Sequence, residues 1–272
     1  MPELPEVETV LQSLLRYDLT NSPIVKIEIK KEYHIKEIGI DCFINSLLGK
    51  SINDIKRKGK WLFFFLEKLV LIGHLRMTGK FFFVENKKQE ANIIFHFLNG
   101  KKLFFCDPRG FGVFYLQKID SFHNLTPFKR IGPDIIQEKI DPSYLYFFFK
   151  KLKITVKEAL LEQKIMSGIG NIYASEILFA CKINPLRLTN EINYKEIEKI
   201  IFFSRNILEE SIKLGGTSII DFISPEEKKG LFKNKLNVYM RKNKECYLCR
   251  SLIKEIKLNR RTTFFCPSCQ KK

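Results

Sequence analysis

Residues 60–84 read KWLFFFLEKLVLIGHLRMTGKFFFV, three short apolar runs separated by a few polar residues. Runs of this length and composition are typical of β-strands joined by tight turns. Similar runs extend from about residue 24 to residue 116, and Asn99 and Gly100 form a dipeptide that favours a two-residue hairpin turn. The sequence therefore predicts antiparallel hairpins that form a β-sandwich or barrel.

A helix is expected ahead of these strands, over about residues 5–17, with Pro5 in its first turn. The apolar residues that recur there at helical spacing are Val7, Val10, Leu11, Leu14 and Leu15. After the strands, TPFKRIGPDIIQEKIDP (126–142) breaks the strand rhythm and marks a domain boundary.

The rest of the chain has helical patterns. Thr155 and Glu158 have the spacing of a capping box that opens a helix over 156–165. SGIGN (167–171) interrupts it, a second helix covers about 172–183, and a long one runs from about 193 to 214 and ends at two glycines. We expect residues 217–235 to form a mobile loop.

The chain has 272 residues and a formal net charge of +17, which indicates a polyanionic partner such as nucleic acid. Drift toward AT-rich codons would also enrich lysine, but it would spread the charge evenly. Residues 228–272 instead hold fourteen Lys or Arg and two acids, a net charge of +12. We find no signal peptide and no apolar run long enough to span a membrane, so we expect a cytoplasmic protein without a membrane partner.

The seven cysteines fall into two groups. Cys42, Cys106 and Cys181 lie among apolar neighbours and are expected to be small buried residues. The other four have the spacing C-x2-C-x16-C-x2-C, which predicts a tetrahedral and therefore structural zinc site, with redox chemistry as the alternative: Cys246, Cys249, Cys266 and Cys269. Arg260 and Arg261 are expected at the hairpin turn between the two pairs, where they can contact phosphate.

Two further motifs carry chemistry. The glycines of SGIGN permit close approach of a phosphate to the amides that open the next helix, although glycine is also common at simple helix junctions. At the start, MPELPEVE (1–8) puts proline after methionine. Removal of Met1 would expose a secondary amine that can attack a sugar carbon and form an iminium. The alternative is that these residues only cap a helix.

Six motifs in this order resemble bacterial formamidopyrimidine-DNA glycosylase over nearly the whole chain. They are PELPEVET, HLRMTGKF, DPRGFG, GIGNIYASE, GGTS and a terminal four-cysteine hairpin that contains RTTFFC. The resemblance implies an α+β protein of two domains, in which a helix and a β-sandwich precede a helical (helix-two-turns-helix) domain with a β-hairpin zinc finger. The expected boundaries are 1–130 for the catalytic domain, 131–143 for a linker, 144–240 for the helical domain and 241–272 for the zinc finger.

The resemblance also implies function. It implies a monomeric, bifunctional glycosylase and AP lyase that binds damaged double-stranded DNA in the bacterial nucleoid, excises 8-oxoguanine and formamidopyrimidines, and cuts the strand by β,δ-elimination. Pro2 would be the nucleophile, Glu3 the catalytic acid and Glu6 a supporting residue. The residues matched to contacts with phosphate or the lesion site are Lys60, His74, Lys164, Asn171 and Arg261.

Excision requires the damaged nucleotide to rotate out of the duplex, and other groups must fill the gap that it leaves. Met77, Arg109 and Phe111 match the wedge that does so in this family. As isolated residues, Met77 and Phe111 would more often belong to a core.

The chain departs from the family pattern at a few positions. Gly110 stands where a basic residue is common, Met240 where glycine is usual, and Glu90 and Asn92 on an expected strand where histidines are frequent. These departures bear on lesion preference and binding strength. The rival interpretations are the endonuclease VIII branch, which favours oxidised pyrimidines, and a zinc-ribbon binding protein without catalysis.

Overall fold

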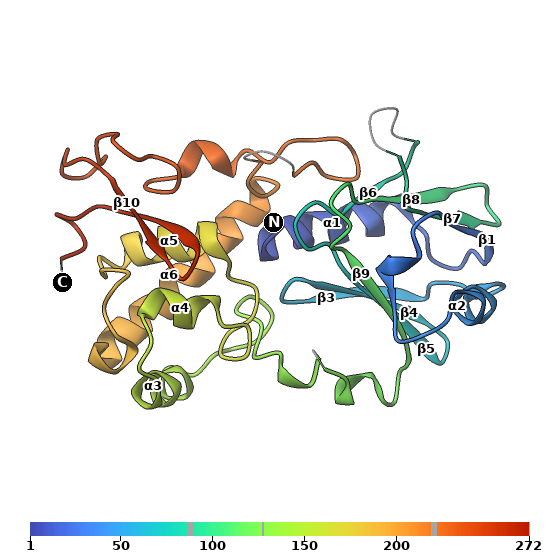
Figure 1. Cartoon of the computed structure of the whole chain (residues 1–272), viewed down its shortest axis with the longest axis horizontal. Helices are drawn as coiled ribbons and strands as arrows, with labels where there is room; N and C mark the ends of the chain where they lie inside the picture. Colours follow the sequence, from blue (N-terminus) through green and yellow to red (C-terminus); the bar gives the residue numbers. More distant parts are fainter. Residues whose placement is uncertain (86–89, 127, 219–221, 272) are drawn as a thin grey trace. The chain divides into compact units, whose positions relative to one another are not determined.

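The computed structural model describes residues 1–85, 90–126, 128–218 and 222–271. The chain divides into two compact units (Figure 1). Unit 1 contains Met1–Lys129 and Leu214–Leu231, and unit 2 contains Arg130–Lys213 and Phe232–Lys272. The four-part domain division expected above stays a prediction; the segment Leu214–Leu231 is grouped with unit 1.

Unit 1 contains two sheets. One has the strand order β1 (Ile24–Ile29), β7 (Ile93–Phe97), β8 (Lys102–Cys106) and β6 (Lys80–Phe82). The other has the order β2 (Ile35–Lys36), β9 (Val113–Lys118), β5 (Leu69–His74), β4 (Trp61–Leu66) and β3 (Asp54–Lys58). The pairs are antiparallel except β2 with β9, a parallel pair that the hairpin pattern did not predict.

A shared core shows that the two sheets form a sandwich. The Phe105 ring of β8 meets the Phe114 ring of β9 edge to face at 4.8 Å, and Phe81 of β6 lies 6.2 Å from Phe114. The helices α1 (Leu4–Tyr17) and α2 (Ile40–Leu47) add apolar residues to the same core. The predicted sandwich preceded by a helix is therefore confirmed.

The unbroken apolar run of β4 has a packing reason. Leu62, Phe64 and Leu66 face the shared core. Phe63 faces the other way and contacts Phe122 and Phe128, at ring distances of 5.7 and 6.0 Å. These rings belong to the short 3-10 helices η2 (Phe122–Asn124) and η3 (Phe128–Arg130), so both faces of the strand are covered.

Unit 2 contains the helices α3 (Pro142–Lys151), α4 (Val156–Leu161), α5 (Asn171–Ala180) and α6 (Tyr194–Lys213). The capping box of Thr155 and Glu158 and the long α6 are confirmed. Helix α4 ends four residues earlier than predicted, because the chain turns at Glu162–Ile165 to form the SGIGN loop. Helix α3, which has Asp141 as its N-cap, was not predicted.

The end of unit 2 is a β-hairpin of β10 (Lys254–Leu258) and β11 (Arg261–Phe265). Short 3-10 helices, η1 (Glu32–His34) in unit 1 and η4 (Thr189–Glu191) and η5 (Phe232–Lys235) in unit 2, complete the elements of the described residues. Among these residues, the longest helices are too short or too polar to cross a bilayer.

Cys106 and Cys181 are buried as predicted, but Cys42 is exposed, because α2 turns it away from the apolar face that Phe43 and Leu47 form. Glu90, which is exposed, and Asn92, which is buried, both precede β7 rather than lying in a strand as expected. The expected mobile loop, residues 217–235, lies partly outside the described residues, at 219–221.

Candidate functional site

The first residues of unit 1 form a buried N-terminal arrangement. Pro2 is buried, and Glu3 and Glu6 expose only 2% and 1% of their surface. Glu3 is the N-cap of α1, and its backbone N–H donates to Glu6 Oε2 at 2.8 Å. Because Glu6 lies one turn into the helix, its side chain reaches back to fix the backbone that carries Pro2 and Glu3.

The second oxygen of the Glu6 carboxylate is bound by the GGTS motif (215–218). Thr217 donates its backbone N–H to Glu6 Oε1 at 2.6 Å. Gly216 has φ +80°, and a Cβ atom there would lie 2.8 Å from Glu6 Oε1. Glycine is required at this position because both the backbone conformation and the close approach exclude a side chain. A single carboxylate thus joins the start of α1 to a segment some 210 residues later in the chain.

Lys60 and His74 lie at one end of the β3–β4–β5 meander. Lys60 follows Gly59, whose positive φ of 58° makes the turn, and it is 6% exposed. His74 pairs with Trp61 in the strand register. Its Nδ1 accepts the backbone N–H of Arg76 at 2.9 Å, so the ring proton is on Nε2. Burial, with Arg76 and Lys60 nearby, lowers the pKa of His74 well below its ordinary value.

Met77, Arg109 and Phe111, the residues matched to the wedge, lie on turns of unit 1 and are exposed. Met77 is 37% and Phe111 51% exposed, so neither is a core residue. The Arg109 guanidinium lies 5.0 Å from the centre of the Phe111 ring, a distance that allows a cation–π contact.

A buried aspartate, Asp107, shapes the turn that carries this arginine and phenylalanine. Asp107 accepts the Thr78 hydroxyl at 2.5 Å and the Gly112 N–H at 2.6 Å. Its own N–H donates to Asn92 Oδ1 at 2.6 Å. Asn92 therefore has a structural use where the family frequently has histidine, because its amide oxygen anchors the start of the DPRGFG turn.

In unit 2, the SGIGN loop is closed by a glutamine. Gln163 Oε1 accepts the N–H of Gly168, whose φ is +108°, and Gln163 Nε2 donates to Ile169 O at 2.9 Å. Lys164 is exposed at the start of this loop. Asn171 opens α5, and its Nδ2 donates to Thr262 O of β11 at 2.9 Å. The loop and the hairpin are thus linked through Asn171.

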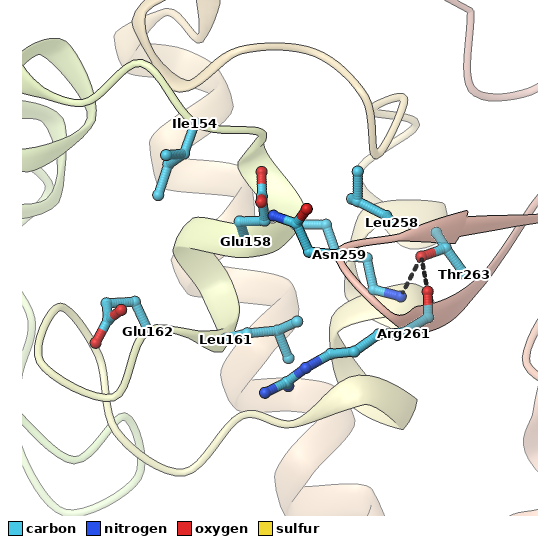
Figure 2. A pocket seen from close by; sticks show the side chains of 9 residues that line it. Ile154, Glu158, Leu161, Glu162, Leu258, Asn259, Arg261 and Thr263 are labelled. Carbon is cyan, nitrogen blue, oxygen red and sulfur yellow. Dashed lines mark hydrogen bonds between the residues drawn. The ribbon is translucent and has the colours of Figure 1, made fainter.

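Of the two arginines predicted at the hairpin turn, Arg260 lies in the turn and Arg261 directly follows it. Asn259 and Arg260 have φ of 43° and 62°, the positive values that a two-residue turn between twisted strands requires. Arg261 is the first residue of β11 and is exposed. It borders a pocket of about 350 Å³ lined by residues of α4 and the hairpin. Figure 2 shows the side chains that line this pocket.

A buried lysine on α4 supports this hairpin. Lys157 is 1% exposed, and its ammonium donates to Thr263 Oγ1 at 2.8 Å, drawn as a dashed line in Figure 2. Lys157 and Asn171 therefore both hold the strand that begins with Arg261. No sequence motif marks Lys157, and a lone lysine in a helix usually lies on the surface.

The tail that leads to the hairpin is held by Glu176 of α5. Its Oε1 accepts the N–H groups of Val238 and Tyr239 at 2.9 and 2.8 Å, and its Oε2 accepts that of Asn237 at 2.8 Å. Burial raises the pKa of Glu176, and these hydrogen bonds oppose that shift. Met240 comes next with φ +57°, which explains why glycine is usual here.

The four clustered cysteines come together as the spacing predicts. Their sulfur atoms lie within 4.8 Å of one another, with Cys246 to Cys269 at 3.9 Å and Cys249 to Cys266 at 3.4 Å. A tetrahedron with metal–sulfur bonds near 2.3 Å has sulfurs about 3.8 Å apart. The four thiols therefore form a possible metal site that fits zinc, and a core of Phe179, Val238 and Phe264 packs against it.

The comparisons with known proteins agree over the whole chain. The family descriptions "Formamidopyrimidine-DNA glycosylase N-terminal domain" and "Formamidopyrimidine-DNA glycosylase H2TH domain" match residues 1–114 and 131–222. The Formamidopyrimidine-DNA glycosylase of Mycoplasma mobile is 39% identical over 274 residues, 99% of each chain. The chain belongs to the formamidopyrimidine-DNA glycosylase family.

Solved members of this glycosylase family have the same fold. A Lactococcus lactis Fpg variant, in complex with a Fapy-dG containing DNA, matches with a TM-score of 0.92, 34% identity and full coverage of both chains. The Lactococcus lactis Fpg in complex with an abasic site containing DNA matches with a TM-score of 0.92 and 33% identity, again over both chains. These matches confirm the two-domain α+β fold with a helix-two-turns-helix domain.

The family's candidate residues are divided between the two units. Unit 1 holds Pro2, Glu3, Glu6, Lys60, His74, Met77, Arg109 and Phe111. Unit 2 holds Lys164, Asn171, Arg261 and the four cysteines. Sequence reasoning missed the residues that position them, such as Asp107, Lys157 and Glu176. Asp107 is the first residue of the DPRGFG motif, and its place before a Pro-x-Gly turn is the signal that could have found it.

Proposed function

We infer that this chain is a bifunctional glycosylase and AP lyase of base excision repair that removes oxidised purines, such as 8-oxoguanine and formamidopyrimidines, from double-stranded DNA. The observation that carries the proposal is the buried N-terminal arrangement, in which Glu6 fixes the backbone of Glu3 next to Pro2. A cap that served only the helix would not need the second hydrogen bond from Thr217.

The proposed reaction begins after removal of Met1. The amine of Pro2 attacks C1′ of the damaged nucleotide, the bond from C1′ to the base breaks, and the base leaves with a proton. Glu3 protonates the deoxyribose ring oxygen as the ring opens, which gives an iminium between the sugar and Pro2. Loss of a C2′ proton then expels the 3′ phosphate, a second elimination expels the 5′ phosphate, and hydrolysis frees Pro2.

The remaining candidate residues bind and open the duplex. Lys60, Lys164, Asn171 and Arg261 supply N–H groups to phosphates or to the lesion, and His74 can donate from Nε2 as a neutral ring. Met77, Arg109 and Phe111 fill the gap left by the extruded nucleotide, with the guanidinium available to the orphaned base. The charge of +17 favours binding that weakens with salt.

One structural zinc ion completes the proposal. Cys246, Cys249, Cys266 and Cys269 would hold it, and it would supply only cross-linking of the hairpin, since four thiolates leave no position for water. We expect Cys249→Ser to weaken DNA binding, because the hairpin carries Arg261. Affinity equal to that of the unsubstituted protein would contradict this role, and measured zinc content serves as the control.

The deciding experiment is borohydride trapping. The mature protein is incubated with abasic-site DNA and sodium borohydride, and the adduct is mapped by peptide mass spectrometry. We expect the sugar on Pro2. A matched protein with an uncleaved N-terminal extension should bind duplex but form no adduct, because its Pro2 nitrogen is an amide. Retention of Met1 in active enzyme, or a sugar attached to lysine, would contradict the mechanism.

The rival functions predict different results in the same assays. A zinc-ribbon binding protein without catalysis would give no adduct. An enzyme of the endonuclease VIII branch would release thymine glycol faster than 8-oxoguanine placed opposite cytosine. We also propose that the protein is a monomer and acts in the bacterial cytoplasm at the nucleoid.

A further inference from the structure

Gly110 leaves a gap in the exposed turn between Arg109 and Phe111, and the phenol ring of Tyr33 covers it. Gly110 has φ +71°, a conformation that favours glycine. A Cβ atom built on Gly110 would lie 2.8 Å from Tyr33 Cε2, 2.9 Å from Tyr33 Oη and 3.0 Å from Tyr33 Cζ. The phenol group of Tyr33 thus occupies the space where a side chain at position 110 would begin.

Tyr33 is held at this place by its neighbour. His34 is fully buried, and its Nδ1 lies 2.7 Å from Gly112 O, so η1 is bonded to the turn just past Phe111. The ring of Tyr33 lies 4.5 Å from the ring of His34. Burial lowers the pKa of His34, so the ring is neutral near pH 7 and donates from Nδ1.

Tyr33 does not behave as a core residue. It is 48% exposed, a value close to the 51% of Phe111 and above the 37% of Met77. The side chain of Tyr33 therefore combines a position beside the wedge residues with exposure to solvent. An exposed tyrosine hydroxyl is a common donor to DNA phosphate oxygens.

We propose that Tyr33 is a DNA-binding residue of the wedge, whose hydroxyl donates a hydrogen bond to a backbone phosphate beside the opened base pair. Gly110 has no side chain to make such a contact, and its bare backbone is what lets the phenol reach this position. The inference rests on the proposed function, because it requires Arg109 and Phe111 to enter the duplex.

The test compares Tyr33→Phe with the unsubstituted protein. Both are titrated, at fixed salt, with a duplex that carries a tetrahydrofuran abasic analogue. Phenylalanine keeps the ring over Gly110 and removes the hydroxyl, so we expect affinity to fall about 10-fold, as for one hydrogen bond to a charged acceptor. Tyr194→Phe is the matched control, since Tyr194 is similarly exposed, at 42%, in unit 2, and should leave affinity unchanged.

A second set of duplexes locates the contact. Methylphosphonates replace single phosphates near the lesion, and one of them should bind the Tyr33→Phe variant and the unsubstituted protein with equal affinity. Equal affinity of the two proteins for the unmodified duplex, or a 10-fold difference that persists at every replaced position, would overturn the inference. Unchanged thermal unfolding shows that the variant is folded.

Borohydride trapping separates this inference from the proposed function. If the unsubstituted protein forms the Pro2 adduct and Tyr33→Phe binds duplex with unchanged affinity, the proposed function is supported and the proposed role of Tyr33 is wrong. If the unsubstituted protein forms no adduct, the proposed function fails, and with it the premise that a wedge enters the duplex.

Discussion

Each unit contains a buried glutamate that holds a distant segment by its backbone amides, and the two differ in what they hold. Glu6 in unit 1 accepts from Glu3 and Thr217. Glu176 in unit 2 accepts from Asn237, Val238 and Tyr239. Glu6 thereby fixes residues proposed to react, while Glu176 fixes the tail that leads to residues proposed to bind. Buried carboxylates of one kind can therefore serve chemistry in one unit and affinity in the other.

The largest expected effect comes from Glu6→Gln. The amide NH2 would face either the Glu3 N–H or the Thr217 N–H, so one of these contacts becomes a donor facing a donor. A displacement of about 1 Å at a reacting group can cost about 100-fold in rate. We expect a fall of about that size in the single-turnover rate of base excision, with duplex affinity unchanged within about two-fold. A loss confined to affinity would contradict the comparison.

The same substitution in unit 2, Glu176→Gln, should have the opposite signature. The amide NH2 would face the N–H of Asn237 or those of Val238 and Tyr239, which loosens the tail before the hairpin. We expect duplex affinity to fall about 10-fold, while the excision rate at saturating enzyme stays near its original value. Glu209→Gln, on the exposed face of α6, is the matched control. A slower rate at saturation would show that Glu176 also serves chemistry.

A pH measurement tests unit 1 separately. The folded-state pKa of His74 lies below its ordinary value of 6.5, so the unfolded chain binds a proton that the folded chain does not. The His74 contribution is therefore fully present above pH 6.5 and is lost as pH falls, by up to about 1.4 kcal/mol per unit. We expect His74→Gln to reduce the slope of unfolding free energy against pH between 6.5 and 5. Because burial also lowers the pKa of His34, part of the slope of unfolding free energy against pH should remain in the His74→Gln variant. An unchanged slope would exclude a buried neutral His74.

The smallest effect is expected at Met240 in unit 2. Its φ of +57° costs a residue with a side chain about 1 kcal/mol or more, and glycine recovers part of that cost. We expect Met240→Gly to raise the free energy of unfolding by about 0.5 kcal/mol, measured by denaturant titration. Lys242→Gly, at a position without positive φ, should lower it instead. A loss of stability in both variants would mean that the backbone at Met240 is not strained.

The sequence predicted most of the local structure because local signals were strong. Short apolar runs indicated the strands, the helical spacing of apolar residues indicated α1, and two glycines marked the end of α6. The Thr155 capping box fixed where α4 begins. Prediction failed where a contact across the fold overrides the local pattern. The end of α4 is set by the turn into the SGIGN loop, and the parallel pair of β2 with β9 depends on a connection of more than 75 residues.

The candidate site divides in the same way. Sequence alone determined the chemical groups: a proline directly after the initiator methionine, carboxylates at Glu3 and Glu6, and four cysteines at zinc spacing, because these depend on residue type and short separations. Only the tertiary structure decided that Thr217 completes the Glu6 contact, that Glu176 holds the tail, and that Tyr33 covers Gly110. These contacts join residues that are far apart in the chain. They depend on backbone amides and on the missing side chain of Gly110, so the residue types in a single sequence do not predict them.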